Sequence, residues 1–269
     1  MPADTPPEPR LDRLTALLRG LSPQVTLLHG SPDPVSLTQP RALPTLHLAL
    51  LPDESGAHAA TSALPRSESS LLVWRADDPA LAWPVSARAT VSLHGQAVLA
   101  GPMAGLLLAA FDGVLAMPLA SADPALQQAV RLIESELLAP RCGGPLLLDR
   151  AGEILFIGLL RHLIAQPRTR HGLLNGLSDP RLARALVAVH DAPQQAWTLE
   201  RLAHTAGMSR TAFATRFRAV MDQPPGEYLF RLRMALARDG LQSGQSLKQI
   251  AAAVGYTPTS LSRALARLH

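Results

Sequence analysis

The chain of 269 residues has a single cysteine, Cys142, and no long uninterrupted apolar run. One cysteine excludes an internal disulfide and is compatible with a reducing compartment. The most apolar stretch, Gly101 to Ala120, is interrupted by Asp112, Gly113 and two prolines, which makes it a poor membrane span. Residues 1–9 are rich in proline and acidic residues and lack the basic start and apolar run of a signal peptide. We therefore expect a cytoplasmic protein that binds no membrane.

Several patterns of catalytic chemistry are also missing. The sequence has no Gly-rich phosphate loop and no Gly-x-Ser-x-Gly nucleophile turn. Cys142 follows Arg141, but a lone cysteine without an evident base is more often inert than reactive. Asp77-Asp78 precedes Pro79 and is typical of a solvated turn. We expect no enzyme, no catalytic residue and no cofactor.

Charge is distributed unevenly along the chain. From Gln195 to the end, ten Lys and Arg residues stand against four Asp and Glu residues. The preceding 194 residues hold 15 Lys and Arg residues and 17 Asp and Glu residues. A basic C-terminal part beside a nearly neutral one suggests a polyanion as partner of the former. Scattered solvating charge is the alternative reading.

The first 120 residues carry mostly short apolar runs separated by Pro, Gly, Asp and Ser. An amphipathic helix is predicted over Arg10 to Leu21, and Leu106–Ala110 could be helical as well. Closely spaced strands with turn signals between them are typical of a small antiparallel barrel or sandwich. The predicted strands include Val25–Leu28, Leu46–Leu51, Leu71–Trp74, Val91–Leu93, Gly105–Phe111 and Val114–Met117.

Helical periodicity returns after Asp123-Pro124, a cap followed by proline at the first helical position. A second helix, about Leu147 to Ala165, is apolar nearly all round, which predicts burial between domains or subunits. We place a linker at Gln166 to Gly176, a polar and basic stretch with Pro and Gly. The predicted domains are 1–176, which includes the linker, and 177–269. Asp179-Pro180 begins the first helix of the second domain.

The region from Leu202 to Leu265 contains an internal repeat with a 48-residue offset. Each copy has an apolar helix face, a turn that begins with Gly, and a second helix opened by a hydroxyl residue, which is the outline of a helix-turn-helix. In the first copy, Thr198 and Ser209 are predicted caps and Gly207 suits a positive φ. Phe213 and Phe217 are predicted to point inward.

The second copy follows a long helix that starts after Pro224-Pro225-Gly226. Ser246 to Gln249 has the capping-box pattern, and Thr257-Pro258 is a hydroxyl cap followed by proline. Its predicted inward set is Leu261, Leu265 and Leu268. Two helix-turn-helix patterns in tandem, in a basic region, favour DNA binding far more than one would.

With these residues in view, the sequence resembles the AraC/XylS family of bacterial transcription regulators over roughly 178–269. The matching residues are Leu199-x-x-Leu202-Ala203-x-x-Ala206-Gly207-Met208-Ser209-x-x-x-Phe213-x-x-x-Phe217, Pro225-x-x-Tyr228-Leu229-x-x-x-Arg233-Met234-x-x-Ala237, Ile250-Ala251-x-x-Val254-Gly255-Tyr256 and Ser262-Arg263-Ala264. The resemblance implies that the two units bind adjacent major-groove segments about one helical turn apart. The implied DNA-binding residues are Arg210, Thr211, Ala214, Thr215 and Arg218 in the first unit, and Thr259, Ser260 and Arg263 in the second.

The second unit departs from the family pattern. It has one residue fewer between Tyr256 and Leu261 than is usual, leucines at 261 and 265 where aromatics are common, and an end at His269 before the usual short tail. In the first unit, Thr215 stands where a base-contacting Arg often lies. We expect the first unit to dominate sequence reading, and the second unit's contact with DNA stays open.

The N-terminal part resembles more loosely the cupin-type sensor domain of one branch of this family. The shared features are the strand-rich region, two helices after it, and Leu148-Asp149-Arg150-x-x-Glu153-Ile154-Leu155-Phe156. This implies a small β-barrel that binds an effector or mediates dimerisation. Metal-binding cupins have a His-x-His pair, which is absent here. We interpret the separated histidines as surface or turn residues and expect no metal site; a metal site assembled from distant strands is the alternative. These histidines are His29, His47, His58 and His94.

The predicted fold class is α+β: a cupin-like antiparallel β-barrel with flanking helices, then an all-α domain of two helix-turn-helix units joined by a long helix. The predicted function is that of a sequence-specific regulator, activator or repressor, that binds double-stranded DNA and responds to a small molecule. A homodimer and contact with RNA polymerase are further expectations. The alternatives are a cupin-like binder or enzyme with a vestigial helical tail, and a regulator that acts through protein contacts after loss of DNA binding.

Overall fold

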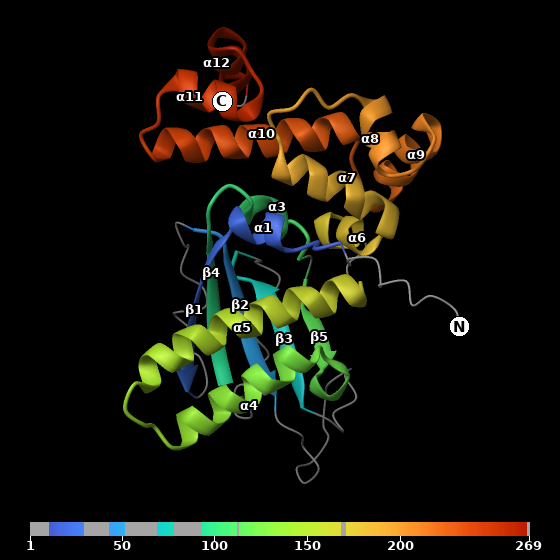
Figure 1. Ribbon diagram of the computed structural model, residues 1–269. Coiled ribbons are helices and arrows are strands. Elements are labelled where there is room, and N and C mark those ends of the chain that lie inside the picture. The colour runs from blue at the N-terminus through green and yellow to red at the C-terminus, as the bar shows by residue number, and fades with distance from the viewer. Residues whose placement is uncertain are drawn as a thin grey trace, which may run out of the picture.

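The N-terminal part is built on a five-stranded antiparallel sheet (Figure 1). The computed structural model describes residues 11–29, 43–51, 69–77, 93–111, 113–167 and 171–267. The strands occur in the order β1-β4-β2-β3-β5, and every neighbouring pair is antiparallel. Their bounds are β1 Ser22–His29, β2 Thr45–Leu51, β3 Ser70–Arg75, β4 Leu93–Ala100 and β5 Leu115–Pro118. The described strands form an open sheet, and the α+β fold class is confirmed.

Two helices cover one face of this sheet (Figure 1). They are α4 (Pro124–Leu138) and α5 (Gly144–Ala165). Since side chains alternate along a strand, Leu46, Leu48 and Leu50 all point to this face and join its core. The two helices approach closely at Gly158, where a Cβ atom would lie 2.7 Å from the backbone nitrogen of Leu126. A larger residue there would push α4 and α5 apart.

The opposite face carries a smaller apolar cluster and two histidines. Ala49, Leu51, Leu72 and Trp74 form the cluster. His47 and His94 are fully buried, and their Nδ1 and Nε2 atoms lie 3.2 Å apart. The interpretation of His47 and His94 as surface or turn residues is therefore wrong; His58 and the side chain of His29 fall outside the described residues.

The C-terminal part is entirely helical in its described residues (Figure 1). Helix α10 is long and runs across the top of the molecule, with α8 and α9 at one end and α11 and α12 at the other. The helices are α6 Leu173–Ser178, α7 Pro180–Asp191, α8 Leu199–Thr205, α9 Arg210–Met221, α10 Pro225–Gln242, α11 Leu247–Val254 and α12 Pro258–Ala266. No described helix combines the length and the apolar composition that a membrane crossing requires.

One hydrophobic core runs from the sheet into the first helix-turn-helix unit. It contains residues of α1 (Thr15–Arg19), the sheet, α3 (Ala104–Leu108), α4 to α9 and the first half of α10, which contributes Leu229 and Leu232. A separate core holds Met234 and Ala237 of α10 together with α11 and α12. The first unit is therefore continuous with the N-terminal part, whereas the second has a core of its own.

The structure corrects five local predictions. The run Gly105–Phe111 contains helix α3, which agrees with the helical alternative. The helix predicted from Arg10 to Leu21 is limited to α1, and α5 begins at Gly144, before the expected start. β4 extends to Ala100, beyond the predicted strand end at Leu93; the polar His94 and Gln96, on the face opposite α4 and α5, interrupt the apolar pattern in the sequence. Residues 173–176, predicted as linker, belong to α6, where Leu173, Leu174 and Gly176 are buried.

Helices α7 and α10 are joined by a buried polar pair. The Nε2 atom of His190 lies 2.5 Å from the hydroxyl oxygen of Tyr228. Burial lowers the pKa of His190 from 6.5 to about 4 and raises the pKa of Tyr228 above its ordinary range. Both side chains are therefore neutral near pH 7.

This pair predicts acid sensitivity. Between pH 6.5 and about 4 the unfolded chain binds a proton at His190 that the folded chain excludes. The free energy of unfolding should therefore fall as pH decreases through this window, by up to about 3 kcal/mol, and be unaffected by this group above it. His190→Gln should flatten the fall in urea titrations at several pH values. The exposed His204→Gln is the control; an equal flattening there would contradict the assignment.

Candidate nucleic-acid interface

The first helix-turn-helix unit is fixed by two hydroxyl caps and an aromatic core. The Thr198 hydroxyl accepts the N–H of Arg201 at 3.2 Å at the start of α8. The Ser209 hydroxyl accepts the N–H of Ala212 at 3.3 Å at the start of α9. Gly207 forms the turn between them with φ +64°, as predicted. These local bonds satisfy helix-end donors that would otherwise lack partners.

The orientation of α9 follows from its buried residues. Phe213, Phe217 and Met221 are at most 3% exposed and pack into the main core. Their spacing leaves the opposite face of α9 toward solvent. The predicted DNA-binding residues lie on that remaining surface: Arg210, Thr211, Thr215 and Arg218 are exposed, and Ala214 is half-buried.

Two arginines of α9 are already paired within the protein. Arg210 forms a 2.8 Å ion pair with Glu200 of α8. The N–H of Glu200 itself and the nearby Arg210 lower the pKa of that carboxyl group. Since both partners are largely exposed, the pair is weak and can open for a phosphate.

Arg216 was not among the predicted site residues, and it is held more firmly. Its Nε atom donates to the carboxylate of Asp179, which is 8% exposed and also accepts the N–H groups of Arg181 and Leu182 at the start of α7. Burial raises the pKa of Asp179, but the hydrogen bonds from Leu182 and Arg216 outweigh it and the pKa is lowered. Arg216 therefore connects α9 to α7. A groove between these helices is lined by Arg181, Thr211 and Thr215 among others.

The second unit repeats this construction with stronger caps. Ser246 and Gln249 form a reciprocal capping box at α11, and Thr257 and Ser260 form another at α12. Gly255 closes α11 with φ +72°. The predicted inward residue Leu261 is fully buried, whereas Leu265 is half-buried and Leu268 falls outside the described residues. The shortened spacing after Tyr256 is accommodated by a helix that begins at Pro258.

The three predicted contacts of the second unit differ in availability. Thr259 and Arg263 are exposed on α12. Ser260 is half-buried, and its hydroxyl accepts the N–H of Thr257 at 3.0 Å and lies 2.9 Å from the Thr257 hydroxyl. A hydroxyl engaged in a cap is less free to contact a base, so Arg263 and Thr259 are the stronger candidates.

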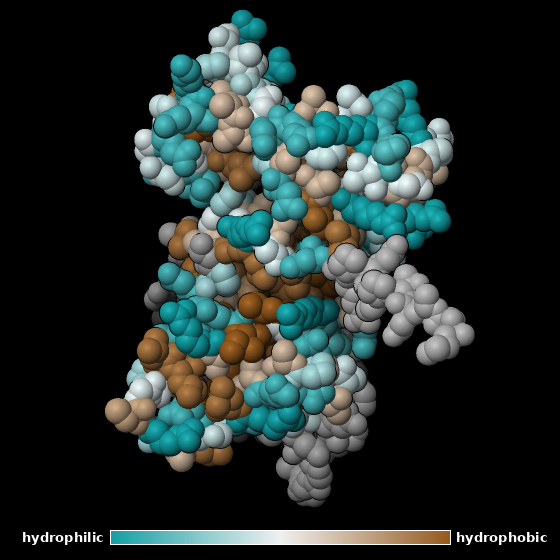
Figure 2. All heavy atoms as spheres, in the orientation of Figure 1, coloured by the Kyte–Doolittle hydropathy of each residue, from teal (hydrophilic) through white to brown (hydrophobic). Residues whose placement is uncertain are grey.

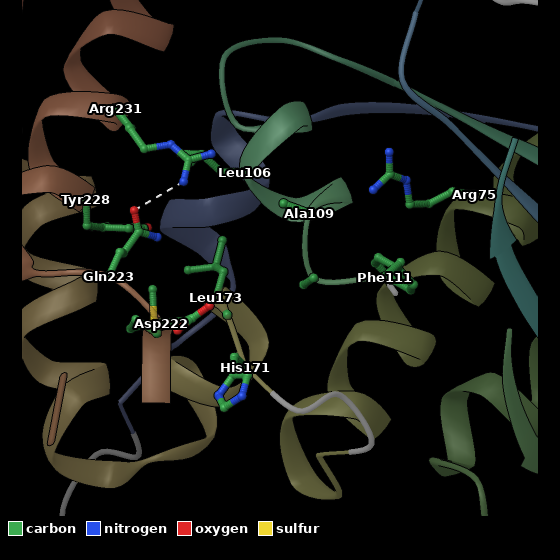
Figure 3. A pocket seen from close by; sticks show the side chains of 13 residues that line it. Arg75, Leu106, Ala109, Phe111, His171, Leu173, Asp222, Gln223, Tyr228 and Arg231 are labelled. Carbon is green, nitrogen blue, oxygen red and sulfur yellow. Dashed lines mark hydrogen bonds between the residues drawn. The ribbon is translucent and has the colours of Figure 1, made fainter. Parts of the chain in front are cut away.

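A cavity of about 510 Å³ lies between the N-terminal part and the first unit (Figure 3). We call it the interdomain cavity. Leu106, Ala109 and Phe111 contribute walls from the N-terminal side, and Arg231 lies on the opposite wall. Arg75, at the far end in Figure 3, donates to the Asp77 carboxylate at 2.7 and 2.9 Å, which lowers the pKa of Asp77.

The chemistry of this cavity is mixed. Its apolar walls include Leu173 from α6 and Met221 from α9. The guanidinium of Arg231 donates to the neutral side-chain amide of Gln223 at 3.2 Å, so its charge is not cancelled by that contact. Asp222, in the left-handed region with φ +56°, also lines the cavity. The lining suits a ligand with an apolar body and an anionic group.

The described part of the chain contains no group of three or more His, Cys, Asp or Glu side chains placed to hold a metal ion. Cys142 is exposed.

Two family models match the chain. A model described as cupin matches residues 25–165, and one described as a helix-turn-helix domain matches residues 202–269. The first covers more than half of the chain, and the second includes both α9 and α12.

Curated transcription regulators match about half of this chain. An AraC-like transcription regulator of Streptomyces lividans is 39% identical over 145 residues, which is 53% of this chain and 48% of that protein. The HTH-type transcriptional regulator AlkR of Acinetobacter baylyi is 37% identical over 137 residues, 50% of this chain and 44% of its own length. The chain thus spans about half the length of the curated relatives it matches. ToxT from Vibrio cholerae O395 aligns over 92% of this chain and 93% of its own with a TM-score of 0.38 and 9% identity.

Proposed function

This chain belongs to the cupin family, with an AraC-type helix-turn-helix domain after its cupin domain, and on that premise we propose that it is a sequence-specific DNA-binding transcription regulator. The observation that carries the proposal is the tandem pair of capped helix-turn-helix units, each with an exposed polar helix face. Residues 1–176 would form the sensor part and residues 177–269 the DNA-binding part. Bacterial DNA lies in the cytoplasm, so the protein would act there.

In this proposal α9 and α12 each enter a major-groove segment of one duplex. Arginines at their exposed ends would neutralise phosphates, which makes affinity dependent on salt, while residues such as Thr211 and Thr215 would face the base edges. Arg218 is the α9 arginine for which no ion pair is recorded among the described residues. It is therefore the α9 arginine best placed to contact DNA without first breaking an internal bond.

Arg218→Ala should weaken DNA binding about tenfold. The slope of log affinity against log salt concentration should also become shallower by about one, because one phosphate contact is lost. The probe is a duplex enriched from a random-sequence library by the wild-type protein, and affinity is measured by fluorescence anisotropy at several salt concentrations. Arg131→Ala removes the same charge from the exposed surface of α4 and should leave affinity unchanged. Equal effects of both substitutions would exclude a specific role for Arg218.

The rival function is a cupin-like binder or enzyme with a vestigial helical tail. The same selection distinguishes it, because such a protein would enrich no sequence from the library. The names of the relatives favour the regulator.

We assign the proposed small-molecule response to the interdomain cavity. Its walls come from both parts of the chain, so a bound ligand would contact the sensor part and the start of α10 together. The apolar walls of this mixed lining and the charge of Arg231 at its edge favour an amphiphilic anion whose charged group would pair with Arg231.

Anilinonaphthalene sulfonate, a fluorescent anion with an apolar body, is a suitable probe of this cavity. We expect it to bind the wild-type protein with enhanced fluorescence, and Ala109→Trp to reduce binding at least fivefold by filling the cavity, about 1 kcal/mol. Gly105→Trp places the same ring on α3 outside the lining, where no atom lies within 4 Å of an added Cβ, and should bind as the wild type does. Equal binding by Ala109→Trp would place the probe elsewhere.

A second copy of the chain is the proposed partner of α4 and α5. Figure 2 shows hydrophobic side chains gathered over these helices, in contrast to the mostly hydrophilic helices at the top. Leu138 is 79% exposed, Leu146 64% and Ile154 47%. An apolar surface of this kind is costly to leave in water and is typical of an association site.

Leu146→Asp should convert a dimer into a monomer, because the interface would bury an unpaired carboxylate. Sedimentation velocity across a concentration series measures the change. Leu241→Asp, at a 46% exposed leucine of α10, is the matched control and should remain dimeric. A wild-type protein that sediments as a monomer at every concentration would contradict the proposed homodimer.

A further inference from the structure

Beside α10, the two helix-turn-helix units meet at a polar joint. Arg233 of α10 donates from Nε to the carbonyl of Pro193 at 2.8 Å and from Nη2 to the carbonyl of Gln195 at 2.7 Å. Its guanidinium carbon also lies 5.6 Å from the centre of the Tyr256 ring, in the turn between α11 and α12. One side chain therefore contacts both the loop before α8 and the turn before α12. We call these contacts the Arg233 joint.

The turn of the second unit is packed against the same loop. Gly255 has φ +72°, and a Cβ atom built on it would lie 2.2 Å from the carbonyl oxygen of Gln194. Gly207 holds the equivalent place in the first unit with φ +64°, but the nearest atom to its Cβ would be the Arg184 guanidinium at 3.7 Å. Both turns require a residue that tolerates a positive φ. Only Gly255 must also lack a side chain, because a Cβ atom there would collide with the Gln194 carbonyl.

The loop itself is anchored in the first unit. The indole N–H of Trp197 donates to the carbonyl of Ala192 at 2.9 Å, which closes the loop on itself. The guanidinium of Arg201, on α8, lies 4.5 Å above the Trp197 ring and also donates to the side-chain oxygen of Gln195. A turn that rests on this loop is therefore held in a fixed relation to α8.

The Arg233 joint attaches the second unit to the first, which the two separate cores do not do. The second unit has its own core, and α10 is the helix that contributes residues to both cores. A single helical connection leaves the second unit able to tilt when the helix bends. A second attachment, away from the α10 axis, removes that freedom.

We propose that the Arg233 joint fixes the angle between α9 and α12, so that both helices meet one duplex at the same time, and that Arg233 is a positioning residue for DNA binding. The inference rests on the proposed function and adds a structural requirement to it. Two linked modules gain affinity only when their geometry permits simultaneous contact. Arg233 acts through the loop and the turn, without contacting DNA itself.

The first test needs no DNA. In a Cys142→Ser background, Thr215→Cys on α9 and Thr259→Cys on α12 carry spin labels, and double electron–electron resonance gives the distance distribution between the units. We expect a narrow distribution in the wild type and a broadened or shifted one in Arg233→Met and Gly255→Ala. Gly207→Ala carries similar backbone strain without the collision and should keep the narrow distribution. Unchanged distributions in both Arg233→Met and Gly255→Ala would overturn the proposal.

The second test uses the enriched duplex with unlabelled full-length protein. Wild type and Gly207→Ala should protect two adjacent major-groove segments in a hydroxyl-radical footprint. Arg233→Met should protect one segment and bind about 100-fold more weakly, since the advantage of linkage is lost. Arg238→Met removes the charge of another α10 arginine, which is exposed, and should retain both segments. A two-segment footprint with wild-type affinity in Arg233→Met would refute the positioning role.

The two proposals fail in different ways. A wild-type protein that enriches no duplex would refute the regulator function, and the spin-label distances would still decide whether the joint holds the units together. Thermal unfolding of each variant, monitored by circular dichroism, establishes that a changed distance arises in a folded chain.

Discussion

Helix α10 contributes side chains to two separate hydrophobic cores along one continuous backbone. Its first half contributes Tyr228, Leu229 and Leu232 to the core shared with the sheet, and its second half contributes Met234 and Ala237 to the core of the second unit. The interdomain cavity lies against the first half of the same helix. A helix transmits displacement along its length because its hydrogen bonds resist local change. A ligand at the first half of α10 and the second unit packed on its second half would therefore contact the same helix.

Features decided by a few neighbouring residues could be predicted from the sequence. The caps at Asp123, Thr198, Ser209 and Ser246 were all predicted, since a short polar side chain and the next turn's N–H groups lie close along the chain. The repeat further predicted the inward aromatics of α9. The exposure of most proposed DNA-binding residues follows from those anchors. Whether they contact DNA stays a prediction, because exposure permits contact without requiring it.

Features that depend on distant segments could not be predicted. The strand order places β4 between β1 and β2, and no local pattern announces that pairing. His47 and His94 looked like separate surface residues because the sequence does not indicate that their strands are neighbours. Arg216 resembled any other helix arginine, yet it bonds a carboxylate 37 positions away. In each case the missing information is tertiary.

The continuity of the main core limits how far this chain can be treated as exchangeable parts. Three leucines of α6 are at most 2% exposed: Leu173, Leu174 and Leu177. Gly176 packs closely against Met221 and Leu186, and a Cβ atom on Gly176 would lie 2.4 Å from the Met221 sulfur. A division of the chain into two domains would place the boundary after residue 176. A cut there would separate Gly176 from Met221 and Leu186 and expose apolar surface on both fragments. A chimera that grafts the C-terminal half onto another N-terminal part would have to carry α6 with it and find a matching surface there. Exchange of whole domains would meet the same obstacle, so the N-terminal part and the first helix-turn-helix unit are expected to change together.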